Sequence, residues 1–168
     1  FAPDAEIYDS ANTVFSSATI YGCTDSTAEA YAEKYNRKFV SLSEISFESK
    51  SVLNGCEMTV DISFARMPHV NSVLIENLVY DTELLELVKV EWNTENAAVT
   101  DWDVSNGTAS ATFEENTDCN GAVLKLTFNV KKEIWGETEI TAGNIVLTRL
   151  EGKNSVPIRF SIVPGTVT

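Results

Sequence analysis

Three segments of this chain alternate apolar and polar residues with a period of two. They are "EMTVDISF" at 57–64, "TASATF" at 108–113 and "AVLKLTFNV" at 122–130. Successive side chains of a β-strand point to opposite sides, so this alternation predicts antiparallel strands with one face buried and one face in water. The residues predicted to face the core are Met58, Val60, Ile62, Phe64, Ala109, Ala111, Phe113, Leu124, Leu126, Phe128 and Val130.

Shorter patterns predict further strands, which turn residues separate. These strands are expected at 44–49, 73–80, 85–92, 98–104, 138–141, 144–150 and 156–162. The predicted turns are Asn54-Gly55, Met67-Pro68, Tyr80-Asp81, Asn106-Gly107, Asn120-Gly121, Gly136, Gly143-Asn144 and Gly152. About nine or ten strands with a turn roughly every ten residues predict an antiparallel β-sandwich.

A single helix is predicted near the start of the chain. Ser26 and Glu29 form a capping box, in which each side chain satisfies a backbone N–H of the first turn. A thin apolar stripe follows at helical spacing: Ala28, Tyr31, Ala32 and Tyr35. Cations expected in the last turn complement the helix dipole: Lys34, Arg37 and Lys38. With a strand on each side, the helix predicts a small strand–helix–strand appendage.

The charge of the chain excludes several classes of function. The net charge is −13, and the segment 76–118 contains eleven acidic residues and one lysine. Nucleic acid would be repelled, because no basic stripe offsets this surface. An acidic face suits a partner with basic residues or a divalent cation, although solubility alone also explains it. No apolar run approaches 18 residues, so we expect no membrane insertion.

The start of the chain and its cysteines say little about its compartment. The sequence begins at Phe1 without an initiator Met or a signal peptide, so we expect a piece of a longer protein. Cys23, Cys56 and Cys119 are odd in number and have no C-x-x-C spacing, which allows at most one disulfide. We expect all three to be small buried hydrophobic residues.

Catalytic residues are not indicated. His69, the only histidine, lies beside Pro68, and the G-x-S-x-G motif of a serine nucleophile is missing. Asp101 and Asp103 project to one face of a predicted strand, but glycosidases need two carboxylates about 5–10 Å apart beneath a cleft. Nothing in the sequence indicates such a cleft. We therefore predict a protein that is not an enzyme.

The sequence suggests one candidate metal site, a calcium-binding loop. Its oxygen ligands would come from alternate residues: Glu114, Asn116, Asp118 and Asn120. The glycine and glutamate positions of an EF-hand are missing, so we predict no metal site and no cofactor.

Tryptophan decides whether a sugar could stack on the sandwich. Trp92 continues the apolar face of Val88 and Val90, which predicts a core position. Trp102 is also predicted to be buried, unless its strand lies at an edge of the sheet. Trp135 precedes a turn glycine and is the best candidate for exposure. Trp135 and Trp102 are thus the residues on which a glycan would stack.

The strand at 73–80 has apolar residues on both faces. Leu74, Leu78 and Tyr80 lie on one face, and Val73, Ile75 and Val79 on the other. If the first set packs inward, the second forms an exposed apolar patch, which usually marks a protein contact. The alternative is that the N-terminal appendage covers this strand.

The segment "ATIYGCTDSTAEAYAEKYNRKFVSL" resembles the closing unit of BspA-like leucine-rich repeat proteins of bacterial cell surfaces. There a "TIYG" strand leads into a "STAEAYAEKY" helix and a short "KFV" strand. The resemblance covers residues 5–42 and includes a shortened preceding rung in "AEIYDSANTVFSSA". It implies that residues 1–42 cap a solenoid whose other repeats precede Phe1, since a solenoid end exposes apolar edges.

Residues 43–168 resemble a cohesin domain, the receptor module of cellulosome scaffoldins. The matching landmarks, in order, are "VLNGCEMTVDISF", "LVYDTELLELVKVEW", "NGAVLKLTFNVKKEIWGETEI" and the closing "PGTVT". Thr82 departs from the family pattern by replacing a proline, and Glu76 by replacing an inward apolar residue. The resemblance implies a flattened jelly roll of about nine strands that holds a dockerin partner on one sheet.

Together these observations predict a non-enzymatic, monomeric protein-binding module at a bacterial cell surface or outside the cell. The partner would be a dockerin-type module. The residues predicted to bind it are Val73, Ile75, Asn77, Val79, Glu114 and Glu115. Two alternatives remain open: a sandwich that binds polysaccharide, and a spacer domain of a leucine-rich repeat protein.

Overall fold

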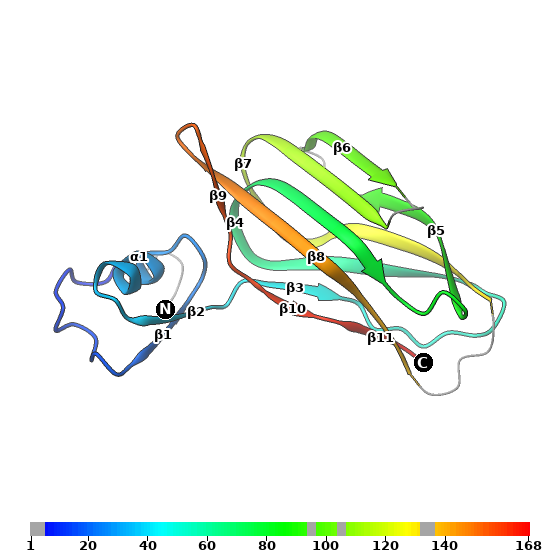
Figure 1. Cartoon of the computed structure of the whole chain (residues 1–168), viewed down its shortest axis with the longest axis horizontal. Helices are drawn as coiled ribbons and strands as arrows, with labels where there is room; N and C mark the ends of the chain where they lie inside the picture. The colour runs from blue at the N-terminus through cyan, green and yellow to red at the C-terminus, as the bar shows by residue number, and fades with distance from the viewer. Residues whose placement is uncertain (1–5, 94–96, 104–106, 132–136) are drawn as a thin grey trace.

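The computed structural model describes residues 6–93, 97–103, 107–131 and 137–168. A small unit lies at one end of a larger β-sandwich (Figure 1). Residues 6–42, the N-terminal unit, contain β1 (Thr19–Gly22), α1 (Thr27–Lys34) and β2 (Lys38–Ser41). The sandwich contains β3 (Glu44–Phe47), β4 (Glu57–Val79), β5 (Leu85–Trp92), β6 (Ala97–Asp103), β7 (Thr108–Val130), β8 (Thr138–Glu151), β9 (Asn154–Pro157), β10 (Ser161–Val163) and β11 (Gly165–Val167).

Two strands, β4 and β7, run the whole length of the sandwich with 23 residues each. The sequence predicted two strands in place of each, separated by turns at Met67-Pro68 and Asn120-Gly121, and this is wrong. The two strands pair at both ends of their length and bend together between 64 and 72, where the register shifts. Arg66 and His69 have φ values of 57° and 60° in this bend. The chain therefore changes direction inside a strand pair.

The bend divides the pairing into two sheets that share β4 and β7. The first sheet has the order β10–β3–β4–β7–β5, and β10 runs parallel to β3. In the second sheet, β6 pairs with β7, β7 with β4, and β4 with β8, while β9 and β11 pair with the two ends of β8. Except for the parallel β10–β3 pair, these pairings are antiparallel, which confirms the predicted β-sandwich.

The core between the sheets contains every inward residue predicted in 57–64, 108–113 and 122–130, together with apolar residues of the other strands. Its largest fully buried side chains are Phe64, Phe128, Ile45, Ile62, Met67, Ile75, Leu85, Leu124, Leu126, Ile140 and Leu147. Burial of apolar surface at about 25 cal/mol per Å² is the main force that holds the two sheets together.

The apolar residues on both faces of 73–80 result from a change of face within β4. Val73 and Ile75 are 1% and 0% exposed, whereas Leu78 and Tyr80 pack against the same core further along. Asn77, between the two sets, has φ 54°, a left-handed conformation that asparagine tolerates better than most residues. The predicted outward patch is therefore wrong for Val73 and Ile75, because the strand turns over at Asn77.

The strand opposite turns over at the same place. Asn144 of β8 pairs with Glu76 on one side of the change, and Ala142 pairs with Leu78 on the other. A Cβ on Gly143 would approach the Asn77 Cβ to 3.2 Å, so glycine allows the two backbones to come close here. Gly143-Asn144 was predicted as a turn, but it lies inside β8.

The N-terminal unit has its own small core. β1 and β2 pair in parallel, and α1 packs on them through Ala28, Tyr31 and Ala32, with Ile20 from β1. Half of the predicted capping box is present, since the Glu29 N–H donates to Ser26 Oγ at 3.4 Å. The Glu29 carboxylate accepts from the N–H of Asp25, one residue before the cap, at 2.7 Å.

The helix ends earlier than the sequence suggested. It stops at Lys34, and Asn36 then adopts φ 50° while the Arg37 N–H donates to Ala32 O at 2.8 Å. This is the bonding of a Schellman motif, which closes a helix with a left-handed residue. Of the three cations, only Lys34 lies in the last turn.

The helix content bears on the membrane prediction. Within the described residues, no helix is long and apolar enough to span a lipid bilayer.

The change of face in β4 yields a test by core truncation. We expect Ile75→Ala to lower the free energy of unfolding by about 2–5 kcal/mol, because it leaves a cavity in the core. Val79 is 49% exposed, so Val79→Ala should change stability by about 0.5 kcal/mol or less. Urea denaturation of both variants measures this difference. Equal losses would show that Ile75 is not a core residue.

Candidate functional site

The outer side of the second sheet is a broad face that four strands build. Register pairs place Asp101, Ser110, Leu74 and Val146 in one row across β6, β7, β4 and β8. We call this surface the second-sheet face. Its described outward residues are Ser72, Leu74, Glu76, Asp101, Asp103, Thr108, Ser110, Thr112, Asn144, Val146 and Thr148.

Hydroxyl and amide groups supply most of the polar surface of this face. Ser72 Oγ and Thr148 Oγ1 are 2.6 Å apart, and Asn144 Nδ2 donates to Glu76 Oε2 at 2.7 Å. Both pairs join β4 to β8 across the sheet. A hydroxyl both donates and accepts, so such groups can adapt to either kind of polar atom on a partner.

Two apolar side chains lie among these polar groups. Leu74 is half-buried and Val146 is 38% exposed, and they face each other across β4 and β8. An apolar contact with a polar margin is typical of protein interfaces.

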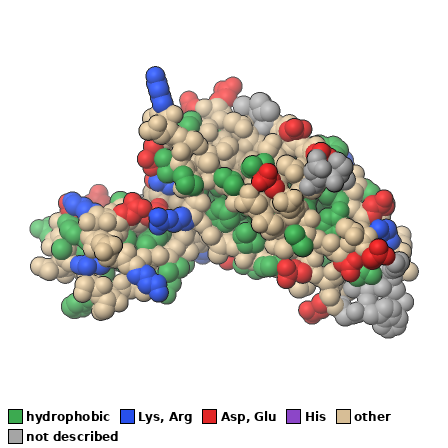
Figure 2. Space-filling model, viewed as in Figure 1, with side chains coloured by type: hydrophobic (Ala, Val, Ile, Leu, Met, Phe, Trp, Pro, Cys, Tyr) green, Lys and Arg blue, Asp and Glu red, His purple; other side chains and the backbone are tan. Residues whose placement is uncertain are grey.

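The charge of the face is negative. Its charged residues Glu76, Asp101 and Asp103 are all acidic, and Lys or Arg is not among its outward residues. Figure 2 shows acidic side chains over this side of the sandwich, with basic ones at its margins and on the N-terminal unit. The face therefore favours a partner with basic groups.

Glu114 and Glu115 lie at one end of this face. Both are exposed and belong to the part of β7 that continues from Thr112 into the bend. Asn71 of β4 fixes the neighbouring backbone, because its Nδ2 donates to Phe113 O at 2.8 Å. The two carboxylates are accessible, as their predicted role requires.

The structure corrects the other predicted contact residues. Val73 and Ile75 belong to the core and are not available to a partner. Asn77 and Val79 are exposed, but they lie at and beyond the change of face. The sequence contained a signal for the true face: the polar side of "TASATF" is Thr108, Ser110 and Thr112.

The structure describes two of the three tryptophans, Trp92 and Trp102. Trp92 packs against the core, as predicted, and its Nε1 donates to Asp101 O at 3.3 Å. Trp102 was predicted to be buried unless its strand lies at a sheet edge; β6 is such an edge strand, and Trp102 is 47% exposed. Its register partner is buried Ala109, so the exposure of Trp102 comes from the missing strand neighbour on the other side of β6 within the described residues. Trp135 lies outside the described residues.

Three of the four side chains of the predicted calcium loop, those of Asn116, Asp118 and Asn120, bond to the backbone of neighbouring strands. Asn116 exchanges two hydrogen bonds with the Leu150 backbone, at 2.8 and 2.9 Å. Asp118 accepts from the His69 N–H, and Asn120 accepts from the Met67 N–H. These bonds hold the bend of β7 against β4 and β8. Across the described ranges, no group of three His, Cys, Asp or Glu side chains is arranged to hold a metal.

The N-terminal unit leaves the second-sheet face open. Its polar contacts with the sandwich involve the β4 bend, the end of β8 and the segment before β10, all at one end of the sandwich (Figure 1). Val73 and Ile75 are covered by the core of the sandwich itself. Residues 6–42 therefore do not cover the strand at 73–80, and the alternative in which the appendage buries it is wrong.

Comparison with known proteins identifies the fold. No protein-family model matches the chain, and no curated protein matches it. The seventh ScaB type I cohesin of Pseudobacteroides cellulosolvens superposes with a TM-score of 0.65 and 23% identity over 75% of this chain and 90% of that one. The cohesin of a type I cohesin–dockerin complex from Clostridium thermocellum superposes with a TM-score of 0.61 and 18% identity, over 74% of this chain and 91% of that one.

A third similar structure is a non-cellulosomal cohesin of the archaeon Archaeoglobus fulgidus. Its TM-score is 0.60 at 19% identity, over 74% of this chain and 88% of that one. Identities this low establish the fold alone. The sandwich has the cohesin jelly-roll fold.

Shifted pKa values occur away from the second-sheet face. A hydrogen bond from Lys50 lowers the pKa of Glu48 on the first sheet, and one from Lys34 lowers the pKa of Asp9 in the N-terminal unit. Burial raises the pKa of the Cys119 thiol to about 11, and the nearby Asp118 carboxylate adds to this. Cys23 and Cys119 are buried as predicted, but Cys56 is exposed, and all three are free thiols.

The cysteines give a test by alkylation. At pH 8 we expect iodoacetamide to modify Cys56 at least about 100-fold faster than Cys119, because the thiolate is the reactive form. The modification of Cys119 should speed up as the pH rises toward 11. Mass spectrometry of peptides measures both rates, and Cys56→Ser should leave only the slow reactions. Similar rates at pH 8 would contradict the burial of Cys119.

Proposed function

We propose that the sandwich is a non-enzymatic module that binds a dockerin-type protein on the second-sheet face. The observation that carries this proposal is the face itself, which is open, acidic and hydroxyl-rich around the apolar pair Leu74 and Val146. The fold supports it, since solved cohesins of this fold have been crystallised in complex with dockerins. Fold alone does not fix function, so the surface chemistry has to carry the argument.

The face suits a helix that presents apolar and basic side chains. Leu74 and Val146 would receive an apolar anchor at the centre, where contacts with water excluded contribute most. Glu76, Asp101 and Asp103, with Glu114 and Glu115 at the end, would attract lysine or arginine during approach. The hydroxyl groups between them would pair with polar atoms of the partner.

The N-terminal unit fits the proposed cap of a leucine-rich repeat array. Within the described residues, β1 pairs with β2 on one side only, so its other edge is available for a strand of a preceding repeat. Tyr8 and Phe15 are exposed aromatic residues of the segment that precedes β1. On this proposal residues 1–42 and 43–168 are separate domains of a bacterial surface protein.

A second candidate function rests on one observation, the exposure of Trp102 at the edge of β6. An aromatic ring at a sheet edge offers a platform on which a sugar ring can stack. Asp101 and Asp103 beside it would accept hydrogen bonds from sugar hydroxyls. This candidate is a polysaccharide-binding sandwich.

The protein-binding proposal predicts the effect of a charge at the centre of the face. Val146→Lys should weaken the binding of a dockerin module at least about tenfold, because it puts a cation where the partner would bring its own. Val163→Lys is the matched control, since Val163 is 42% exposed but lies on β10 of the first sheet. Isothermal titration calorimetry in calcium, with dockerins of the source organism, measures both.

Three outcomes are informative. Loss with Val146→Lys and not with Val163→Lys supports the second-sheet face. Equal loss with both would place the partner elsewhere. A folded protein that binds none of the dockerins would overturn the proposal and favour the spacer alternative.

The glycan candidate predicts a different pattern. Trp102→Ala should lower the affinity for a polysaccharide by about tenfold, through the loss of one stacking contact. A glycan array identifies the ligand, and tryptophan fluorescence titration measures the affinity of both proteins. An array without signal for the unmodified chain would remove this candidate.

A further inference from the structure

The arginines and the histidine of the sandwich gather at its junction with the N-terminal unit. Residues 43–168 contain three arginines and the only histidine of the chain. All four contact the N-terminal unit: Arg66, His69, Arg149 and Arg159. This grouping stands out in a chain of net charge −13.

The N-terminal unit presents acidic residues to three of these side chains. Asp25 Oδ2 lies 2.5 Å from His69 Nδ1, and Asp25 Oδ1 lies 3.5 Å from Arg149 Nε. Arg159 lies 3.9 Å from a Glu29 oxygen and 3.8 Å from a Glu33 oxygen. Asp25 therefore joins one element of the N-terminal unit to two different strands of the sandwich, β4 and β8.

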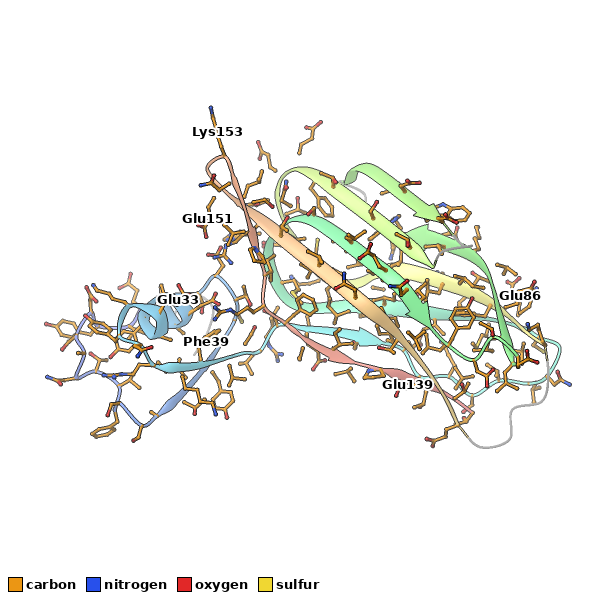
Figure 3. All side chains as sticks on the ribbon, in the orientation of Figure 1. Glu33, Phe39, Glu86, Glu139, Glu151 and Lys153 are labelled. Carbon is orange, nitrogen blue, oxygen red and sulfur yellow. The ribbon has the colours of Figure 1, made fainter. Side chains whose placement is uncertain are left out.

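Arg149 is held in place for this contact. Its side chain is 13% exposed, and its Nε and one terminal nitrogen also donate to Glu151 Oε1, at 3.1 and 2.8 Å. Figure 3 labels Glu151 near the hairpin of β8 and β9, and Glu33 on α1. A partly buried, doubly bonded arginine loses less conformational entropy in an ion pair than a free one.

A second set of contacts lies near the place where the chain passes between the units. Buried Thr24 donates from Oγ1 to Arg159 O at 2.6 Å, and its N–H donates to Ser43 Oγ at 3.3 Å. Ser43 Oγ in turn donates to Arg66 O at 2.6 Å. These neutral hydrogen bonds lie close to residues 41–43, where the chain connects the two units, and we call this region the pivot. Because they are all near one point, other contacts have to fix the rotation of one unit relative to the other.

Apolar packing does not fix that rotation. The hydrophobic clusters of the sandwich and of the N-terminal unit share no member among the described residues. Without shared apolar burial, the orientation depends on the ionic contacts beyond the pivot.

Backbone conformation also concentrates at the junction. Five described non-glycine residues have positive φ, and three of them are Asp25, Arg66 and His69, at 60°, 57° and 60°. Such conformations are unfavourable for most residues and persist where the surroundings hold them. Asp25 and His69, whose side chains lie 2.5 Å apart across the junction, are both among these residues.

From these contacts we propose that Asp25 is an ionic latch that fixes the orientation of the N-terminal unit on the sandwich and that salt releases it. With the latch closed, Thr24 and Asp25 hold the two units as one body. With the latch open, the units stay tethered at Thr24 and Ser43 and rotate about this pivot.

The test measures orientation in the full chain. One fluorophore is attached to the exposed native Cys56 and the other to Ala30→Cys on the exposed side of α1. Single-molecule energy transfer then reports the distance distribution. Asp25→Asn removes the charge and keeps a residue that accepts positive φ. Asp9→Asn is the matched control, because Asp9 pairs with Lys34 inside the N-terminal unit at 2.6 Å.

We expect a narrow distribution for the unmodified chain and for Asp9→Asn, and a broad one for Asp25→Asn. Sodium chloride at about 1 M should broaden the first two and leave Asp25→Asn unchanged, since salt screens exposed charges. Circular dichroism checks that each variant is folded, and His69→Gln serves as a second way to weaken the latch. A narrow distribution for both Asp25→Asn and His69→Gln would overturn the proposal.

Discussion

The continuous pairing of β4 with β7 is the constraint on which the rest of the sandwich depends. Each strand belongs to both sheets, so the two sheets cannot be separated without breaking one ladder. This arrangement requires the bend, where the register shifts and where Arg66 and His69 adopt left-handed backbone conformations that are unfavourable for most residues. Asn116, Asp118 and Asn120 stabilise the bend by bonding the backbones of β8 and β4. These three residues, which the sequence suggested as ligands of a calcium loop, therefore stabilise the fold.

Alternation predicted the core well where a strand keeps one face inward. The inward residues of 57–64, 108–113 and 122–130 were all correct, since burial of one face imposes a period of two. It failed where a strand turns over, because the period alone does not reveal a change of phase at Asn77. Glycine and proline pairs were read as turns, but Met67-Pro68 and Asn120-Gly121 lie in a bend that pairing across the strands maintains. That pairing is a long-range property, which local propensity does not contain.

The candidate site was predictable in part for the same reason. Glu114 and Glu115 are accessible as expected, whereas Val73 and Ile75 were misassigned with the phase of their strand. Ser72, Ser110, Thr112 and Thr148 form a surface only because three strands align them, and no one of them stands out in the sequence. The exposure of Trp102 was predicted only for an edge strand, and strand order is a long-range property that the sequence pattern does not contain. The function of the face therefore has to be argued from the assembled surface.

The parallel pairing of β10 with β3 affects how the sandwich resists mechanical force. β3 is the first strand of the sandwich and β10 is close to its end, and a parallel bridge between Lys50 and Val167 continues the contact. Tension on the two ends of the sandwich would draw these strands in opposite directions along their axes. The hydrogen bonds between them would then bear the load together and would not open one after another. Resistance of this kind is a property of the unfolding rate and not of the equilibrium stability.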